Sequence, residues 1–196
     1  FFLIIFVSCS KEKTETPPEP EAKTLVSSVD LSALPQIEST NSAFYNADDQ
    51  PEDVLTTLKK QGVNTIRLRL WNNPENSHSS FAEVKTFAAK IKSKGFKVWL
   101  TVHYSDTWAD PGNQKTPEEW QGKSYNEIKD SVYAYTEKIV TEIQPEYIQI
   151  GNEINTGILF PYGKISENEA QFREIITTGS QAVRDNSDNT KIIIHF

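Results

Sequence analysis

Apolar side chains follow two alternating kinds of spacing along the chain from residue 25 onward. Short stretches in which apolar residues alternate with others, or run together, are typical of strands. They predict strands at residues 25–31, 64–70, 96–104, 146–153 and 191–196. Between these stretches, apolar residues recur every three or four positions, which indicates helices that bury one face. The predicted helices span residues 51–61, 81–94, 124–143 and 166–184, and the last of them opens with a capping box of Ser166 and Glu169.

Strands that alternate with helices of this length indicate a parallel sheet, either doubly wound or closed into a barrel. No glycine-rich phosphate loop follows a predicted strand, which counts against a nucleotide-binding doubly wound domain. Polar and aromatic residues gather where three consecutive strands end, at residues 69–71, 103–106 and 152–153. A (β/α)8 barrel builds its active site from these ends and usually needs about 250 residues. We therefore predict an α/β fold in which residues 24–196 form roughly the first half of a (β/α)8 TIM barrel, strands 1 to 5, within a longer protein.

The first 23 residues differ in composition from the rest of the chain. Residues 1–8 are nearly all apolar and precede Cys9; the run is too short to cross a membrane but fits the end of a signal peptide. The small residue before Cys9 and the polar residues after it resemble a bacterial lipobox, in which the cysteine is lipidated, although Phe6 stands where leucine is usual. Residues 10–23 are charged and proline-rich, which predicts a disordered tether.

Residues 1–9 are therefore expected to be a partial lipoprotein signal peptide, with Cys9 as the lipidated residue. This predicts a secreted protein, a bacterial cell-surface or periplasmic lipoprotein, that contacts a membrane only through its lipid anchor. The alternative is an ordinary signal peptide with an incidental cysteine.

Charge and the few cysteines and histidines exclude several classes of protein. The net charge is −7 with acidic and basic residues interspersed, whereas a nucleic-acid-binding protein usually shows a basic stripe. Cys9 is the single cysteine, so no internal disulfide can form. The three histidines, His78, His103 and His195, lack the spacing of metal ligands. We expect no nucleic-acid partner, no cofactor and no metal in these residues, and leave a calcium site open only for the part of the barrel beyond Phe196.

Four segments near the predicted strand ends carry a family resemblance. They are residues 29–35 (VDLSALP), 62–74 (GVNTIRLRLWNNP), 103–112 (HYSDTWADPG) with Gln114 and Trp120, and 149–155 (QIGNEIN). In these segments the chain resembles glycoside hydrolase family 53, the endo-β-1,4-galactanases of the clan of retaining (β/α)8 glycosidases. The third and fourth segments are specific to the family, whereas the pair Asn152 and Glu153 is shared by the whole clan. Ser28-Val29-Asp30 departs from the usual Gly-Ala-Asp of the first strand.

The resemblance implies a role for each matching residue. Glu153 would be the catalytic acid/base, and the nucleophile would lie beyond the end of this chain, on the seventh strand. Asn152 would hydrogen-bond the sugar 2-hydroxyl, and Arg69, more than Arg67, would keep the nucleophile ionised, since an arginine lowers the pKa of a neighbouring carboxyl. The remaining substrate-binding candidates are His103, Trp108, Trp71 and Asp106.

Each candidate also has a purely structural interpretation. Glu153 could form a surface salt bridge, because a glutamate at a strand end is common in a chain with 27 acidic residues. Trp71 and Trp108 could pack in the core instead of against the C–H face of a sugar. His103 could be a hydrogen-bonded structural histidine, and Asp106 could be structural or contact the substrate.

The function implied by the resemblance is endo-hydrolysis of β-1,4-galactosidic bonds in galactan or arabinogalactan with retention of configuration. Two carboxyl groups carry out such a reaction. One alternative is another retaining β-glycanase of the same clan, a mannanase or a β-glucanase. The other alternative is a non-catalytic surface glycan-binding lipoprotein that kept the barrel.

Overall fold

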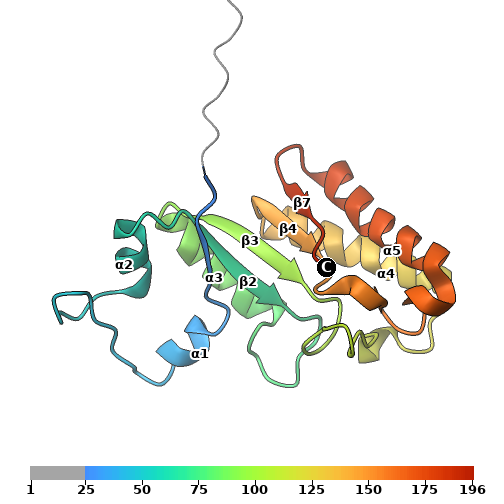
Figure 1. The fold of residues 1–196 in the computed structure, drawn as a ribbon, viewed down its shortest axis with the longest axis horizontal. Helices are drawn as coiled ribbons and strands as arrows, with labels where there is room; N and C mark the ends of the chain where they lie inside the picture. The colour runs from blue at the N-terminus through green and yellow to red at the C-terminus, as the bar shows by residue number, and fades with distance from the viewer. Residues whose placement is uncertain (1–24) are drawn as a thin grey trace, which may run out of the picture.

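Five parallel strands form the sheet of the computed structural model, which describes residues 25–196. The strands are β1 (Ser28–Asp30), β2 (Thr65–Leu70), β3 (Lys97–Val102), β4 (Tyr147–Ile150) and β7 (Lys191–Ile193). They lie in the order β1-β2-β3-β4-β7, so the order of the strands in the sheet follows their order in the sequence (Figure 1). The predicted parallel sheet is confirmed, with each strand shorter than its apolar stretch. Cys9 and the tether at residues 10–23 lie outside the described residues.

Helices connect the strands and pack against one face of the sheet (Figure 1). They are α2 (Val54–Lys60), α3 (Phe81–Ser93), α4 (Tyr125–Glu142) and α5 (Ile165–Asn186), and α4 and α5 lie side by side. The alternation in β2 explains how the layers form, because successive side chains of a strand point to opposite faces. Ile66 and Leu68 are fully buried in the core, whereas Arg67 and Arg69 are only partly buried. The opposite face of the sheet is therefore polar enough to form a site.

The start of α5 differs from the prediction. Lys164 is the N-cap and makes no side-chain capping bond, so the expected capping box of Ser166 and Glu169 is wrong. The chain enters the helix directly from β6 (Gly163–Lys164), which pairs antiparallel with β5 (Gly157–Ile158). A first helical turn therefore begins at Ile165 and contains Ser166, and a kink at Asn168, whose φ of −142° and ψ of 52° are not helical, separates it from the rest of α5. The capping box that does form is the one that opens α4, between Ser124 and Glu127.

Short elements that the apolar spacing did not predict occupy the loops that follow the strands. They are α1 (Leu34–Glu38) after β1, η1 (Glu118–Trp120) after β3, and η2 (Ile154–Thr156) with the β5–β6 hairpin after β4. Elements of two to five residues are too short to show a helical or strand period. In a (β/α)8 barrel these are the loops that hold the site. No helix in the described part of the chain has the length and hydropathy needed to cross a bilayer.

Candidate active site

The carboxyl ends of β1 to β4 bring most of the predicted site residues together. Asp30 pairs in register with Arg67, and Arg69 lies in one row with Thr101 and Gln149. His103 follows β3 directly, and the pair Asn152 and Glu153 comes two residues after the end of β4. Side chains from strands 37 to 85 residues apart therefore meet at one edge of the sheet.

Asn152 is held by hydrogen bonds at both ends of its side-chain amide. Its Nδ2 donates to the carbonyl oxygen of Ala109 at 2.9 Å. Its Oδ1 accepts from Nη2 of Arg67 at 3.1 Å and from Nε2 of Gln149 at 3.2 Å. These partners fix the positions of the amide oxygen and nitrogen, because two donors face the oxygen and an acceptor faces the nitrogen. The buried Asn152 side chain is therefore held in one orientation in the site.

Arg67 links Asn152 to a carboxylate on the first strand. Its Nη1 donates to Oδ2 of Asp30 at 2.6 Å, and the other oxygen of Asp30 accepts from the backbone and the hydroxyl of Ser32. Burial raises the pKa of Asp30, but the hydrogen bonds from Ser32 and Arg67 outweigh this effect and leave the pKa below its usual value. Asp30 is therefore ionised at neutral pH and orients the arginine that contacts Asn152.

Arg69, the arginine that the sequence favoured, turns toward tryptophans. Its guanidinium carbon lies 4.3 Å from the ring centre of Trp71 and 4.2 Å from that of Trp108. Its Nε donates to Oγ of Ser79 at 3.0 Å. Arg67, which lies further from the strand end, is the arginine bonded to Asn152. The position along the strand did not reveal this difference, because both side chains point to the same face.

Trp71, His103 and Trp108 form one aromatic cluster around Arg69. The ring centre of Trp108 lies 5.8 Å from those of both Trp71 and His103, in edge-to-face arrangements. Trp71 is 9% exposed, as the packing interpretation expects, whereas Trp108 is 55% exposed. Trp108 therefore has an open aromatic surface next to the site, and the other rings support it.

His103 is buried and accepts a hydrogen bond at Nδ1 from the backbone N–H of Ala109 at 3.0 Å. An accepting Nδ1 carries no proton, so the neutral ring has its proton on Nε2. Burial, and then the positive charges of Arg69 and Arg67, lower the pKa of His103 from 6.5 to about 3. The ring is therefore neutral at physiological pH.

The depressed pKa of His103 predicts that acid destabilises the full-length protein. Between pH 6.5 and about pH 3, the unfolded chain binds a proton at this position and the folded chain does not. The free energy of unfolding therefore falls as the pH falls through this window, by at most about 1.4 kcal/mol per pH unit. His103→Gln keeps an acceptor for Ala109 and should remove this part of the dependence. Urea unfolding of both proteins at pH 7 and pH 5 measures it, and equal losses in both would contradict the assignment.

Glu153 has an unusual backbone and a free carboxylate. Its φ of 48° and ψ of 53° lie in the left-handed region, which costs a residue other than glycine about 1–3 kcal/mol. Its N–H points to Nδ1 of His195 at 3.4 Å, and its carbonyl accepts from Nε2 of Gln114 at 3.2 Å. Among residues 25–196, the half-buried carboxylate makes neither a hydrogen bond nor an ion pair. A surface salt bridge, the structural interpretation of Glu153, does not form there.

Asp106 uses both carboxylate oxygens within the protein. Oδ1 accepts from the backbone N–H of Asn73 at 2.9 Å, and Oδ2 accepts from that of Glu118 at 2.7 Å. Asp106 thereby ties the loop after β2 to the loop after β3. These bonds favour the structural role among the two that the resemblance allowed. The sequence interpretation had assigned no role in the site to Asp30, Gln114 or His195.

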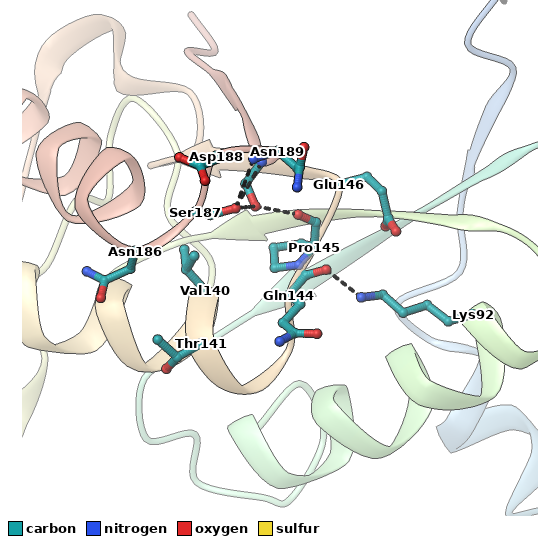
Figure 2. A pocket seen from close by; sticks show the side chains of 11 residues that line it. Lys92, Val140, Thr141, Gln144, Pro145, Glu146, Asn186, Ser187, Asp188 and Asn189 are labelled. Carbon is teal, nitrogen blue, oxygen red and sulfur yellow. Dashed lines mark hydrogen bonds between the residues drawn. The ribbon is translucent and has the colours of Figure 1, made fainter.

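A cavity of about 620 Å³ lies at the opposite end of the sheet, where the strands begin (Figure 2). Its polar groups bond to one another: Lys92 donates to the carbonyl oxygens of Ile143 and Gln144, and the hydroxyl of Thr190 donates to that of Pro145. In barrel enzymes this end serves stability, not catalysis. The candidate active site is therefore the edge around Glu153. The part of the chain that the structure describes contains no cluster of three or more potential metal ligands.

Residues 26–196 match the model of glycosyl hydrolase family 53. The chain belongs to glycosyl hydrolase family 53. Two curated relatives of this chain are the endo-β-1,4-galactanase of Bacillus subtilis and a probable arabinogalactan endo-β-1,4-galactanase A of Aspergillus fumigatus. They are 30% and 33% identical to this chain over 89% and 85% of its length. The match covers 42% and 49% of their own lengths, so the chain spans about half of these curated relatives.

A solved family-53 structure has the same fold. The catalytic domain from Ignisphaera aggregans superposes with a TM-score of 0.83 at 37% identity, over 87% of this chain and 51% of that domain. This agreement and the parallel sheet confirm the barrel over the doubly wound alternative. The family-53 chain thus contains the first five strands of a (β/α)8 barrel.

Proposed function

We propose that the whole protein is a glycosidase that hydrolyses internal β-1,4-galactosidic bonds of galactan or arabinogalactan with retention of configuration. One observation carries the proposal: at the carboxyl end of β4, the Glu153 carboxylate has no partner among residues 25–196, and it directly follows an asparagine that Arg67 and Gln149 hold in one orientation. Two relatives named as galactanases support the choice of substrate.

In this mechanism Glu153 protonates the oxygen of the leaving sugar and later takes a proton from the attacking water. A retaining enzyme also needs a nucleophilic carboxylate about 5–5.5 Å from the acid. We propose that a later strand of the barrel supplies it. The left-handed backbone of Glu153 turns the chain away from the strand, which lets the carboxyl group face a substrate instead of a strand neighbour.

Substrate contacts follow from the neighbouring side chains. Asn152 places its amide next to Glu153 and can bond the 2-hydroxyl of the sugar at the cleavage point. The exposed ring of Trp108 can pack against the C–H face of a sugar, while Arg69 and Trp71 fix its position. His103 completes this wall as a neutral ring. Asp106 shapes the loops through its two hydrogen bonds to backbone N–H groups.

Hydrolysis assays with the purified full-length protein test the proposal. We expect cleavage of galactan, but not of mannan or β-glucan, and NMR should show the β-anomer as the first product. Cleavage of mannan or β-glucan instead would favour another activity of the clan. Galactan binding without any hydrolysis would favour the glycan-binding alternative, which has no use for the free carboxylate of Glu153.

We also propose that the protein is secreted and anchored to a bacterial membrane through a lipid on Cys9. The apolar run at residues 1–8 and the charged tether at residues 10–23 support this proposal. Cys9→Ala should therefore move the protein from the membrane fraction to the soluble fraction, because acyl chains provide the membrane affinity. Fractionation with mass spectrometry of the mature N-terminus measures this. An unmodified N-terminus downstream of Cys9 in the wild-type protein would refute it.

A further inference from the structure

Gln114 is a buried polar residue in the loop between β3 and η1, and it joins that loop to the chain after β4. Its side chain is 1% exposed. Its backbone carbonyl accepts from the N–H of Phe160 at 2.7 Å, and Thr116 donates from its hydroxyl to the carbonyl of Phe160 at 2.8 Å. The loop is therefore docked by Phe160 independently of the Gln114 side chain.

The side-chain amide of Gln114 points at the two residues of the candidate active site. Its Nε2 donates to the carbonyl oxygen of Asn152 at 2.8 Å and to that of Glu153 at 3.2 Å. Its Oε1 is buried and has no hydrogen-bond partner among residues 25–196. A flipped amide would place Oε1 against two carbonyl oxygens, so the observed orientation is the one that the surroundings allow.

A buried oxygen without a partner is unfavourable, so the position of Oε1 calls for an explanation. The explanation is the pair of carbonyl groups that the same amide holds. One of them belongs to Glu153, whose left-handed backbone persists only where its surroundings hold it. The N–H of Glu153 makes only a long contact with His195, while its carbonyl, as the N-cap of η2, also opens the first turn of that short helix.

We propose that Gln114 is a positioning residue that holds the backbone of Asn152 and Glu153, and thereby aims the catalytic carboxyl group at the leaving oxygen. The proposal rests on the proposed function of Glu153. Gln114 lies 39 residues from Glu153 in sequence and acts on its main chain, not on the substrate.

Gln114→Met in the full-length protein keeps the length of the side chain and removes both hydrogen bonds. Because a displacement of about 1 Å at a catalytic group can cost about 10²-fold, we expect kcat/KM on galactan to fall by that order. The loss should be much smaller on a dinitrophenyl β-galactobioside, whose leaving group needs no proton from Glu153. Thr116→Val is the matched control: it removes a bond of the same loop to Phe160 and should leave both values within about threefold of wild type.

Gln114→Glu adds a readout that a packing role would not change. A buried carboxyl group facing two carbonyl oxygens has a raised pKa. When protonated it can donate one hydrogen bond, and when ionised it repels both carbonyls. Activity should therefore fall as the pH rises through this new pKa, in addition to the alkaline limb that deprotonation of the acid Glu153 gives wild type and Gln114→Met alike.

Equal losses on the two substrates, or a loss no larger than that of Thr116→Val, would overturn the proposal. A crystal structure of Gln114→Met provides a readout independent of activity: we expect Glu153 to leave the left-handed region, and an unchanged Glu153 backbone also overturns it. If wild type folds but does not cleave galactan, the proposed function fails, while the crystal structure still tests the positioning. Gln114→Asn, which is too short to reach both carbonyls, replaces Gln114→Met if that variant is insoluble.

Discussion

Glu153→Gln in the full-length protein is expected to lower galactan hydrolysis by about 10²–10⁴-fold, the usual contribution of general acid catalysis. Glutamine keeps the shape of the side chain and can still donate a hydrogen bond, but it cannot deliver a proton to the leaving oxygen. The carboxylate has no partner among residues 25–196, so its replacement breaks no bond within this part of the protein. Galactan binding should therefore survive, and initial rates together with a binding isotherm measure the two effects separately.

Azide rescue shows which step the variant has lost. An aryl galactoside with an activated leaving group forms the glycosyl-enzyme intermediate with little need for an acid. Release of that intermediate still needs Glu153 as a base, so it should accumulate in Glu153→Gln. Azide needs no base, should restore turnover, and should give a β-galactosyl azide if the enzyme retains configuration.

Glu167→Gln is a suitable control, because Glu167 is an exposed glutamate near the start of α5 that pairs with Lys164. It should keep wild-type activity, since exposed ion pairs contribute little. Galactan hydrolysis by Glu153→Gln at nearly the wild-type rate would show that Glu153 is not the acid/base. An azide product of α configuration would show that the enzyme does not retain configuration.

The sheet could be predicted from the sequence because its signal is local. In β2, Ile66 and Leu68 alternate with Arg67 and Arg69, and the structure buries the first pair under the helices. The rule that barrel sites form at the carboxyl ends of strands then predicted that Asn152, Glu153 and His103 lie at one edge of the sheet, where the structure has them. These steps need only the spacing of apolar residues along the sequence and the parallel arrangement of the strands.

The bonds within the site could not be predicted, because they join residues far apart in sequence. Arg67 contacts Asn152 across 85 residues, and nothing local distinguishes it from Arg69 on the same face. The sequence showed Gln114 only as one residue of a family motif. The role proposed for it depends on the carbonyls of Asn152 and Glu153 and on the left-handed backbone of Glu153, which the sequence does not reveal. The false capping box at Ser166 has a different origin: the β5–β6 hairpin leads directly into α5, and strands of two residues are too short to show a period in the sequence.

Gly157→Ala is expected to cause the largest loss of stability among single substitutions in this loop. Gly157 has a φ of 128° and a ψ of −161°, a region that is essentially limited to glycine. A Cβ at this position would overlap the carbonyl oxygen of Gly163 and lie 3.0 Å from Cα of Lys164. Both obstacles are backbone atoms of the paired strand β6, so no side-chain rotation relieves them. The strain and the clash together should lower the free energy of unfolding by roughly 4–5 kcal/mol, the range of exceptional substitutions.

Gly62→Ala separates the two causes. Gly62 also has a positive φ, 83°, but no atom lies within 4 Å of the position that a Cβ would take, so only the backbone strain is tested. That strain should cost about 1–2 kcal/mol. Denaturant unfolding and soluble yield of the two full-length variants measure the difference. Equal losses would mean that the β5–β6 hairpin yields to accommodate the new methyl group. A loss several times larger in Gly157→Ala would mean that this hairpin, which follows Glu153 by four residues, is a rigid part of the loop that carries the acid.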